Sequence, residues 1–509
     1  MIRAGSIAWI ARHEGRLAWR DLLWMMTAGR RRRARTLALG FIVFLLFMHG
    51  FAALMLASYD LGASSPDKRM LVMLMATLVL SWSLMLSQAI EAVTRAFYSR
   101  ADFDLVLSSP LSAGRFFAVR IAAMVQTVLL MALAVAAPFV DVAVWRGGAR
   151  WLGAYIVIVV LAALAVSVAV ALTAALFRLI GPKRTRLVAQ ILAAVVGAGF
   201  VIGLQLAAIQ SYHTISRFMV LQSDLLINAA PATSSVLWWP ARAILSEPLA
   251  LIAMLGLGTA VFGATVCFFA PRFAGYVLAA AGASHAPKRE SRKSAAFRNR
   301  SVAAALRRKE WMLLWRDPWL VSQTLMQLLY LLPPAFLLWS AFGQGGTASI
   351  LVVPVLIMGA GQLAGALAWL AICGEDAPDL IASAPVPSAR ALRSKTEAVM
   401  IAIAFVFGPF IVFLAAIAPF CALVACLGVA LGAASATSIQ IWFRTQAKRS
   451  HFRRRQTSSR IATYAEALSS CSWAGTGALA AAGSWLAIAG GVIALAILGG
   501  ALMISPSKK

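Results

Sequence analysis

Charged side chains are scarce in this sequence. Only 13% of its 509 residues are Asp, Glu, Lys or Arg, whereas soluble proteins have about 25%. Hydrophobic residues make up 61% of the chain, and the mean hydropathy is +0.83. A water-soluble fold of this length has no way to bury so much apolar surface, and lipid is the solvent that matches it. The composition therefore excludes an ordinary soluble protein and predicts a membrane protein.

Acidic residues are much scarcer than basic ones: the sequence has 18 Asp and Glu but 46 Lys and Arg. The formal net charge is +28, and the isoelectric point is about 11.3. In a soluble protein this excess would favour nucleic-acid binding. In a membrane protein it has another cause, since Lys and Arg are retained on the cytoplasmic side. The position of the basic residues along the chain separates the two interpretations.

Cysteine and enzymatic motifs are also scarce. The five cysteines are odd in number and lack metal-ligand spacing, which excludes a disulfide framework or zinc site. No GxxxxGK[ST] phosphate loop, HExxH motif or serine-nucleophile elbow occurs. We therefore expect no enzyme activity, metal or cofactor in this chain. The first 36 residues lack a compact apolar core with a cleavage site, so no cleavable signal peptide is expected.

Long apolar runs dominate what remains. A helix needs about 20 mostly apolar residues to cross a bilayer, and the sequence predicts an all-α polytopic protein with twelve spans. Pro419 divides one run that is too long for a single crossing, and Gly483 divides the last two spans. The expected spans are 37–58, 70–93, 118–140, 151–177, 188–209, 248–270, 319–342, 349–373, 396–417, 419–443, 461–482 and 485–504.

The basic residues follow this topology. With a cytoplasmic N-terminus, 40 of the 46 Lys and Arg fall in cytoplasmic segments. The positive-inside rule therefore places both termini in the cytoplasm of a bacterial inner membrane. The clusters Arg30–Arg33 and Arg453–Arg455 are interpreted as topology signals and contacts to anionic lipids, in preference to a specific partner site. No nucleic-acid partner is expected.

Two cytoplasmic elements occur twice along the chain. The residues before the first span recur before the seventh at a constant offset of 296, and the residues after the second span recur after the eighth. The first pair matches Glu14, Trp19, Arg20 and Asp21 with Glu310, Trp315, Arg316 and Asp317. The second pair matches Asp104, Leu105, Ser108, Pro110 and Arg115 with Asp379, Leu380, Ser383, Pro385 and Arg390, and Arg120 with Lys395.

These matches predict an internal duplication. Residues 1–270 form the first six-span half, 271–300 a basic cytoplasmic linker, and 301–509 the second half. Because six spans is an even number, both halves enter and leave on the same face. They are therefore parallel repeats, related by an axis along the membrane normal.

Each repeated element has a physical interpretation. Arg12, Arg16 and Arg20 form a cationic row on one side of a helix that lies in the headgroup plane; the alternative is an ordinary basic flank. In the second element, Asp104 is expected to cap a short helix that Pro110 breaks, with Asp379 and Pro385 as their counterparts. The alternative is a simple helical turn. Two such elements on one face favour docking to a two-fold symmetric soluble partner.

These elements resemble those of the permease subunits of ATP-binding-cassette exporters of the second type. That family has an elbow helix before the first span and a coupling helix between spans two and three. The resemblance implies a fused pair of six-span units that exports an unknown substrate. It also implies a separate ATPase, in two copies, that carries the ATP and Mg. The long outer segment Gln210–Glu247 fits the external helices that the family has before its sixth span. The chain departs from the pattern at the corresponding segment of the second half, Ala480–Ser484, which is short, and at Glu375 and Asp376, which replace Arg100 and Ala101.

Two other functions stay open. An ion-coupled secondary transporter would need ionisable residues within the membrane, and His49, Glu397 and Glu466 are the candidates. Their scarcity disfavours ion coupling. A membrane anchor or sensor for a soluble ATPase, with no transport of its own, is the third interpretation.

The charge distribution predicts which connections water-soluble reagents reach. Cysteine introduced as Ser291→Cys or Thr457→Cys should resist labelling from outside the cell, because both connections are cytoplasmic. Cysteine introduced as Ser234→Cys should be labelled. The measurement is reaction of intact cells with a membrane-impermeant maleimide. Labelling of the Ser291→Cys variant from outside would reverse the topology.

Overall fold

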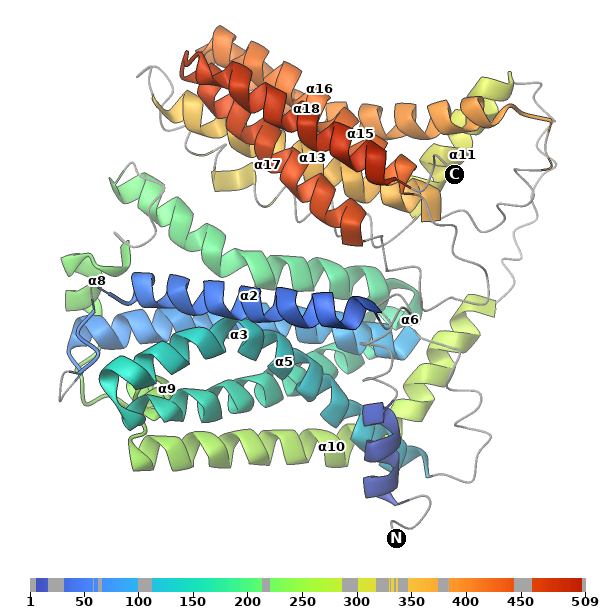
Figure 1. Cartoon of the computed structure of the whole chain (residues 1–509). Coiled ribbons are helices and arrows are strands. Elements are labelled where there is room, and N and C mark those ends of the chain that lie inside the picture. Colours follow the sequence, from blue (N-terminus) through green and yellow to red (C-terminus); the bar gives the residue numbers. More distant parts are fainter. Residues whose placement is uncertain are drawn as a thin grey trace. The chain divides into compact units, whose positions relative to one another are not determined.

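The structure is a computed structural model of the whole chain, in which the described residues form helices joined by short turns and loops (Figure 1). The described residues are 6–16, 32–57, 59–62, 66–98, 112–212, 220–285, 301–316, 329, 331–333, 336, 347–373, 383, 385–443 and 460–505. Nine helices within these ranges are long and apolar enough to cross a membrane. The chain is therefore an all-α protein with the helices of a polytopic membrane protein.

Contacts divide the chain into two compact units. The first contains Met1–Leu204 and Ser216–Arg289, and the second contains Gln205–Ile215 and Glu290–Lys509. Each unit has its own hydrophobic core.

The first unit begins with a helix over residues 7–16. Its longer helices are α2 (Arg32–Met55), α3 (Lys68–Tyr98), α5 (Ala113–Gly147), α6 (Gly153–Tyr212) and α10 (Pro248–His285), and the short ones are η1 (Ala149–Leu152), α8 (Asp224–Ala229), η2 (Val236–Trp238) and α9 (Trp239–Ile244). Helix α6 contains two spans, because Gly181 has a φ of 75° and precedes Pro182. Glycine tolerates that positive φ, and the extended backbone before a proline interrupts the helix.

Stacked aromatic rings join three helices of the first unit. The ring of Phe97 on α3 lies 4.2 Å from that of Phe273 on α10, which lies 4.5 Å from that of Phe117 on α5. All three side chains are almost completely buried. Rings at these separations gain dispersion and quadrupole energy beyond their buried area. They fix the C-terminal part of α3 against the N-terminal part of α5.

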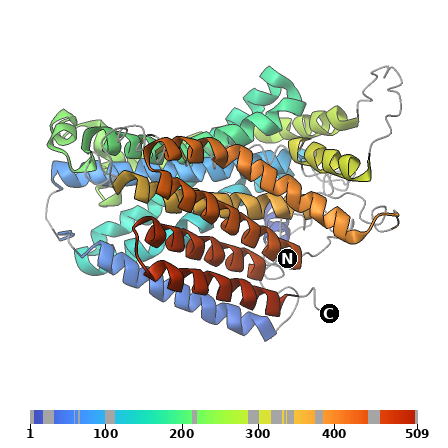
Figure 2. The ribbon, with the colours of Figure 1, turned by 90° about the horizontal axis from the view of Figure 1, so that it is seen from above.

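The second unit contains α11 (Val302–Arg316), α13 (Thr347–Cys373), α15 (Ser388–Ile417), α16 (Pro419–Trp442), α17 (Arg460–Ala481) and α18 (Leu486–Ile504). Pro419 begins α16 immediately after α15 ends, as the sequence predicts. Gly483 has a φ of 69° in the turn between α17 and α18. These two helices lie side by side in Figure 2, where they are red.

Each expected span except 319–342 overlaps one helix or one half of α6. Most of 319–342 lies outside the described residues. Helices α2 and α17 overlap expected spans but are not among the nine helices that are long and apolar enough to cross a membrane. In α2 the described apolar part is the shorter Phe44–Met55. Helix α17 is rich in Ser, Gly and Thr, which lowers its hydropathy.

A close contact between a glycine and a serine occurs in both units. In the first unit, a Cβ atom added to Gly197 on α6 would lie 2.8 Å from Oγ of Ser87 on α3. In the second, a Cβ added to Gly361 on α13 would overlap Ser470 on α17. Ser87 and Gly361 are 274 residues apart, and Gly197 and Ser470 are 273 apart. The contact therefore joins α3 with α6 in the first unit and α13 with α17 in the second, with the residue types exchanged.

This contact predicts opposite effects of two neighbouring substitutions. Gly199→Ala should raise the apparent melting temperature, because nothing lies within 4 Å of the added Cβ and Ala is about 1 kcal/mol better than Gly in a helix. Gly197→Ala should lower it, because overpacking costs about 1–3 kcal/mol. The measurement is thermal unfolding of both purified variants in detergent. Equal shifts would show that α3 and α6 are not closely packed at Ser87.

Candidate functional site: the two elbow junctions

The helix over residues 7–16 is attached to the first unit by a partly buried ion pair. Ile10 is 2% exposed and belongs to the hydrophobic core. Glu14 lies four residues later, on the same face of the helix. Its Oε2 accepts a hydrogen bond from Nη1 of Arg120 at 2.9 Å. This pair of Glu14 with Arg120 is called the first elbow junction below.

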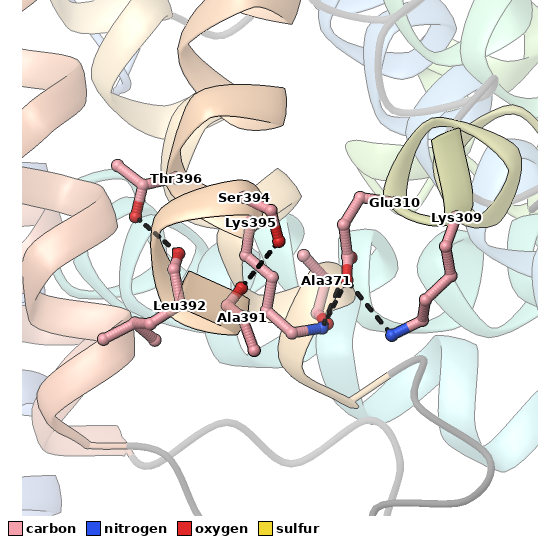
Figure 3. Close-up of polar contacts among 8 residues, drawn as sticks. All are labelled: Lys309, Glu310, Ala371, Ala391, Leu392, Ser394, Lys395 and Thr396. Carbon is pink, nitrogen blue, oxygen red and sulfur yellow. Dashed lines mark hydrogen bonds and ion pairs between the residues drawn. The ribbon is translucent and has the colours of Figure 1, made fainter. Parts of the chain in front are cut away.

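The second unit has the corresponding pair. Glu310 on α11 is 1% exposed, and its carboxylate lies 3.3 Å from Nζ of Lys395 on α15. Nζ of Lys309 lies 3.1 Å from Oε1 of the same carboxylate. Figure 3 shows both ammonium groups directed at Glu310. Glu310, Lys309 and Lys395 form the second elbow junction.

Lys395 also contacts a third helix. Its ammonium donates to the carbonyl oxygen of Ala371, near the C-terminus of α13 (Figure 3). The C-terminus of a helix is its negative end and has carbonyl groups without a partner in the helix. One side chain therefore joins α11, α13 and α15.

Equivalent positions carry the cations of the two junctions. Helix α5 begins at Ala113 after the N-cap Ser112, and α15 begins at Ser388 after Pro387. Arg120 and Lys395 each lie seven residues after the first residue of their helix. Ser112 and Ser388 thus lie at helix starts, although the Ser112 side chain makes no capping hydrogen bond.

Burial distinguishes the junctions from the other ion pairs near them. The side chains of Glu14 and Arg120 are 16% and 18% exposed. In contrast, Glu397 pairs with Arg393 and Arg307, whose side chains are 82% and 51% exposed. Solvent screens such exposed pairs, which contribute about 0–1 kcal/mol. Removing one partner of a buried pair costs about 3–5 kcal/mol, because the other charge is left uncompensated.

The other residues predicted for these elements are only partly described. Arg115, Ser383, Pro385 and Arg390 are exposed to solvent, and Trp315 and Arg316 are the last residues of α11. The remaining ones lie outside the described residues: Trp19, Arg20, Asp21, Asp104, Leu105, Ser108, Pro110, Asp317, Asp379 and Leu380. The capped-helix interpretation of the coupling segments therefore stays a prediction.

The three ionisable candidates in the apolar runs all have polar partners. Glu397 lies in the third turn of α15 and accepts from Arg393, and Glu466 accepts a hydrogen bond from Gln440. His49 lies 3.2 Å from Asp141, which also accepts from the hydroxyl of Tyr155 at 2.5 Å. Sequence reasoning missed Asp141, Tyr155 and Gln440, because each lies on a different helix from its partner.

Comparison with known proteins identifies no relative. No protein-family model matches the chain, and no curated protein or solved structure matches it.

The second junction predicts a large difference between two carboxylates. Glu310→Ala should destabilise the protein by about 3–5 kcal/mol, since it leaves two ammonium groups beside a buried site. Glu397→Ala should cost about 0–1 kcal/mol, because its partners are exposed. Thermal unfolding of the purified full chain provides the comparison.

A double variant tests the reason for the loss. Glu310→Ala combined with Lys395→Met should recover part of the stability lost in Glu310→Ala, since replacing both members of a buried pair by apolar groups is often neutral. A double variant less stable than the single one would show that burial of the charge is not the cause.

Proposed function

We propose that this chain is the transmembrane permease of an ATP-binding-cassette exporter, working with a separately encoded ATPase. In this proposal the chain has twelve spans in two parallel six-span repeats, each with an elbow helix and a coupling helix. It lies in the bacterial inner membrane with both termini in the cytoplasm. The chain itself carries no ATP site, and the ATP and Mg are bound by two copies of the partner.

The paired elbow junctions carry this proposal. Glu14 and Glu310 come from the first repeated element, and Arg120 and Lys395 follow the second repeated element along the chain. The elbow helix of each half is therefore bonded to the helix that continues from its coupling segment. Two segments matched only by sequence pattern thus meet in space in both halves, which supports a duplication with an elbow and a coupling element per half.

The second junction suggests how the partner's motion would reach the membrane. The coupling segment lies between the end of α13 and the start of α15. Lys395 contacts the carbonyl of Ala371 before this segment and the carboxylate of Glu310 on the elbow helix. Displacement of the segment by an ATPase would therefore move α13, α15 and α11 as one body.

The charges around the second junction fit the inner leaflet. Arg308, Arg390 and Arg393 are exposed on α11 and α15, and Arg393 pairs with the carboxylate of Glu397. Cationic side chains at this depth attract anionic phospholipid headgroups. The same lipids would hold α11 in the membrane plane, as expected for an elbow helix.

The outer connections differ between the halves. In the first half, α8, η2 and α9 lie between α6 and α10, and Asp224 on α8 pairs with Arg69 on α3 at 2.9 Å. In the second half a short turn joins α17 to α18. The long outer segment resembles the external helices that the family carries before its sixth span. Only one half would then provide an outer cap over the transport path.

An ion-coupled carrier is the second candidate function, and one observation favours it. Glu466 lies among apolar helices, and within the described part of the chain its hydrogen-bond partner is the amide of Gln440. Transport that persists in membranes lacking any ATPase would select this carrier over the exporter.

The coupling segments predict a loss of ATPase binding. The double variant Asp104→Ala with Asp379→Ala should retain less ATPase than either single variant, because two tethered contacts reinforce each other. Each substitution should cost about 0.5–2 kcal/mol through a lost helix cap. The measurement is co-purification of the full chain with the ATPase encoded beside it.

Asp67→Ala is the matched control. The Asp67 carboxylate accepts from the backbone N–H of Met70 at 2.8 Å and so caps α3. It lies on the opposite side of the membrane in the proposed topology, so its loss should leave ATPase capture unchanged. Undiminished capture by a folded Asp104 and Asp379 double variant would contradict the coupling assignment.

A further inference from the structure

A single carboxyl group lies between three helices of the second unit. Glu466 projects from α17, and its Oε2 accepts a hydrogen bond from Nε2 of Gln440 on α16 at 2.5 Å. Gln440 is 6% exposed. On the third side, a Cβ atom added to Gly365 of α13 would overlap the carboxyl group. The carboxyl therefore packs directly against the backbone of α13.

Among the described residues, no cationic group pairs with the Glu466 carboxyl; Gln440 is its hydrogen-bond partner. Helices α13, α16 and α18, which pack against α17, contain no Asp, Glu, Lys, Arg or His. Their titratable residues are Cys373, Cys421 and Cys426, and α17 itself adds Arg460, Tyr464 and Cys471. Arg460 begins the helix, about 9 Å along the axis from Glu466. An ionised Glu466 would therefore be a solitary charge among apolar helices.

Hydroxyl groups next to the carboxyl have unused hydrogen-bonding capacity. Ser469 and Ser470 follow Glu466 by about one turn, and Thr437 precedes Gln440 by three residues, on the same face of α16. Each of the three is 1% exposed, and their oxygens have no hydrogen-bond partner among the described residues. Ser470 borders Gly361, one turn along α13 from Gly365. Buried hydroxyl groups without a hydrogen-bond partner are rare in protein interiors. They indicate that this site binds an additional atom or ion.

The geometry selects a proton as that species. A metal cation needs several oxygen ligands around an open position, but the carboxyl is closed between the Gln440 amide and the α13 backbone. The backbone carbonyls of the surrounding helices are used within those helices. A proton needs no cavity, and it removes the charge that the apolar surroundings oppose.

We propose that Glu466 is an intramembrane proton-binding site, occupied while α17 is closed against α13. The neutral carboxyl accepts from Gln440 and fits against Gly365. Ionisation would require water at the carboxyl, so proton release is coupled to separation of α17 from α13. The adjacent hydroxyls of Ser469 and Ser470 provide hydrogen-bond positions along which the proton enters or leaves.

This inference goes beyond the exporter proposal and does not depend on an ATPase. Loss of ATPase capture concerns the coupling segments, whereas proton occupancy concerns the packing of three helices in the second unit. An experiment that contradicts one proposal therefore leaves the other intact.

Infrared spectroscopy of the full chain in detergent tests the proton directly. At about pH 7 an ordinary glutamate is ionised, and a protonated carboxyl is recognised by its own C=O stretching band. The difference spectrum between the unmodified protein and Glu466→Gln should contain one such band. Glu466→Gln keeps the side-chain size and a neutral group, so it should remain folded, as checked by size-exclusion chromatography.

Two glycine variants test the geometric cause. Gly365→Ala should remove the band, because the added methyl group displaces the carboxyl from α13. Gly475→Ala, also within this unit, should keep the band, since nothing lies within 4 Å of its added Cβ. A difference spectrum without a protonated carboxyl band would overturn the proposal. Retention of the band in Gly365→Ala would overturn the assignment of proton binding to closure on α13.

Discussion

A buried charge in an apolar protein must have a partner of opposite sign, and this constraint organises one end of each unit. Glu14 and Glu310 lie on the inward faces of their helices, where burial would be costly without Arg120 and Lys395. Satisfying each carboxylate fixes its helix, residues 7–16 or α11, at one position on the bundle. In the second unit Lys395 also bonds the carbonyl of Ala371 on α13, so that attachment includes three helices.

The apolar solvent imposes a second constraint on helix packing. Lipid provides no hydrophobic driving force between helices, so close approach of backbones has to supply dispersion energy. Glycine and serine meet that need where Gly197 faces Ser87 and where Gly361 faces Ser470. The exchange of residue types between the halves preserves one small and one slightly larger partner. The spacing of the helices is thus retained although neither residue is.

The few other polar side chains in the helices are distributed unequally between the halves. The first unit has the group of His49, Asp141 and Tyr155, and the second has Glu466 with Gln440. The polar side chains within the helices therefore differ between the two units. The short helices α8 and α9 belong to the first unit.

Long apolar runs and their proline and glycine interruptions were sufficient to predict helix positions. Pro419 and Gly483 end helices through backbone geometry, which is a local property of the residue. The sequence pattern also matched Glu14 with Glu310, but it did not indicate which residues these carboxylates pair with. Pairing of Glu310 with Lys395 joins residues 85 positions apart, and no periodicity specifies which distant residue a buried charge meets. The contact of Glu466 with Gln440 and Gly365 is of the same kind, because three helices decide together how much room and charge compensation one carboxyl receives.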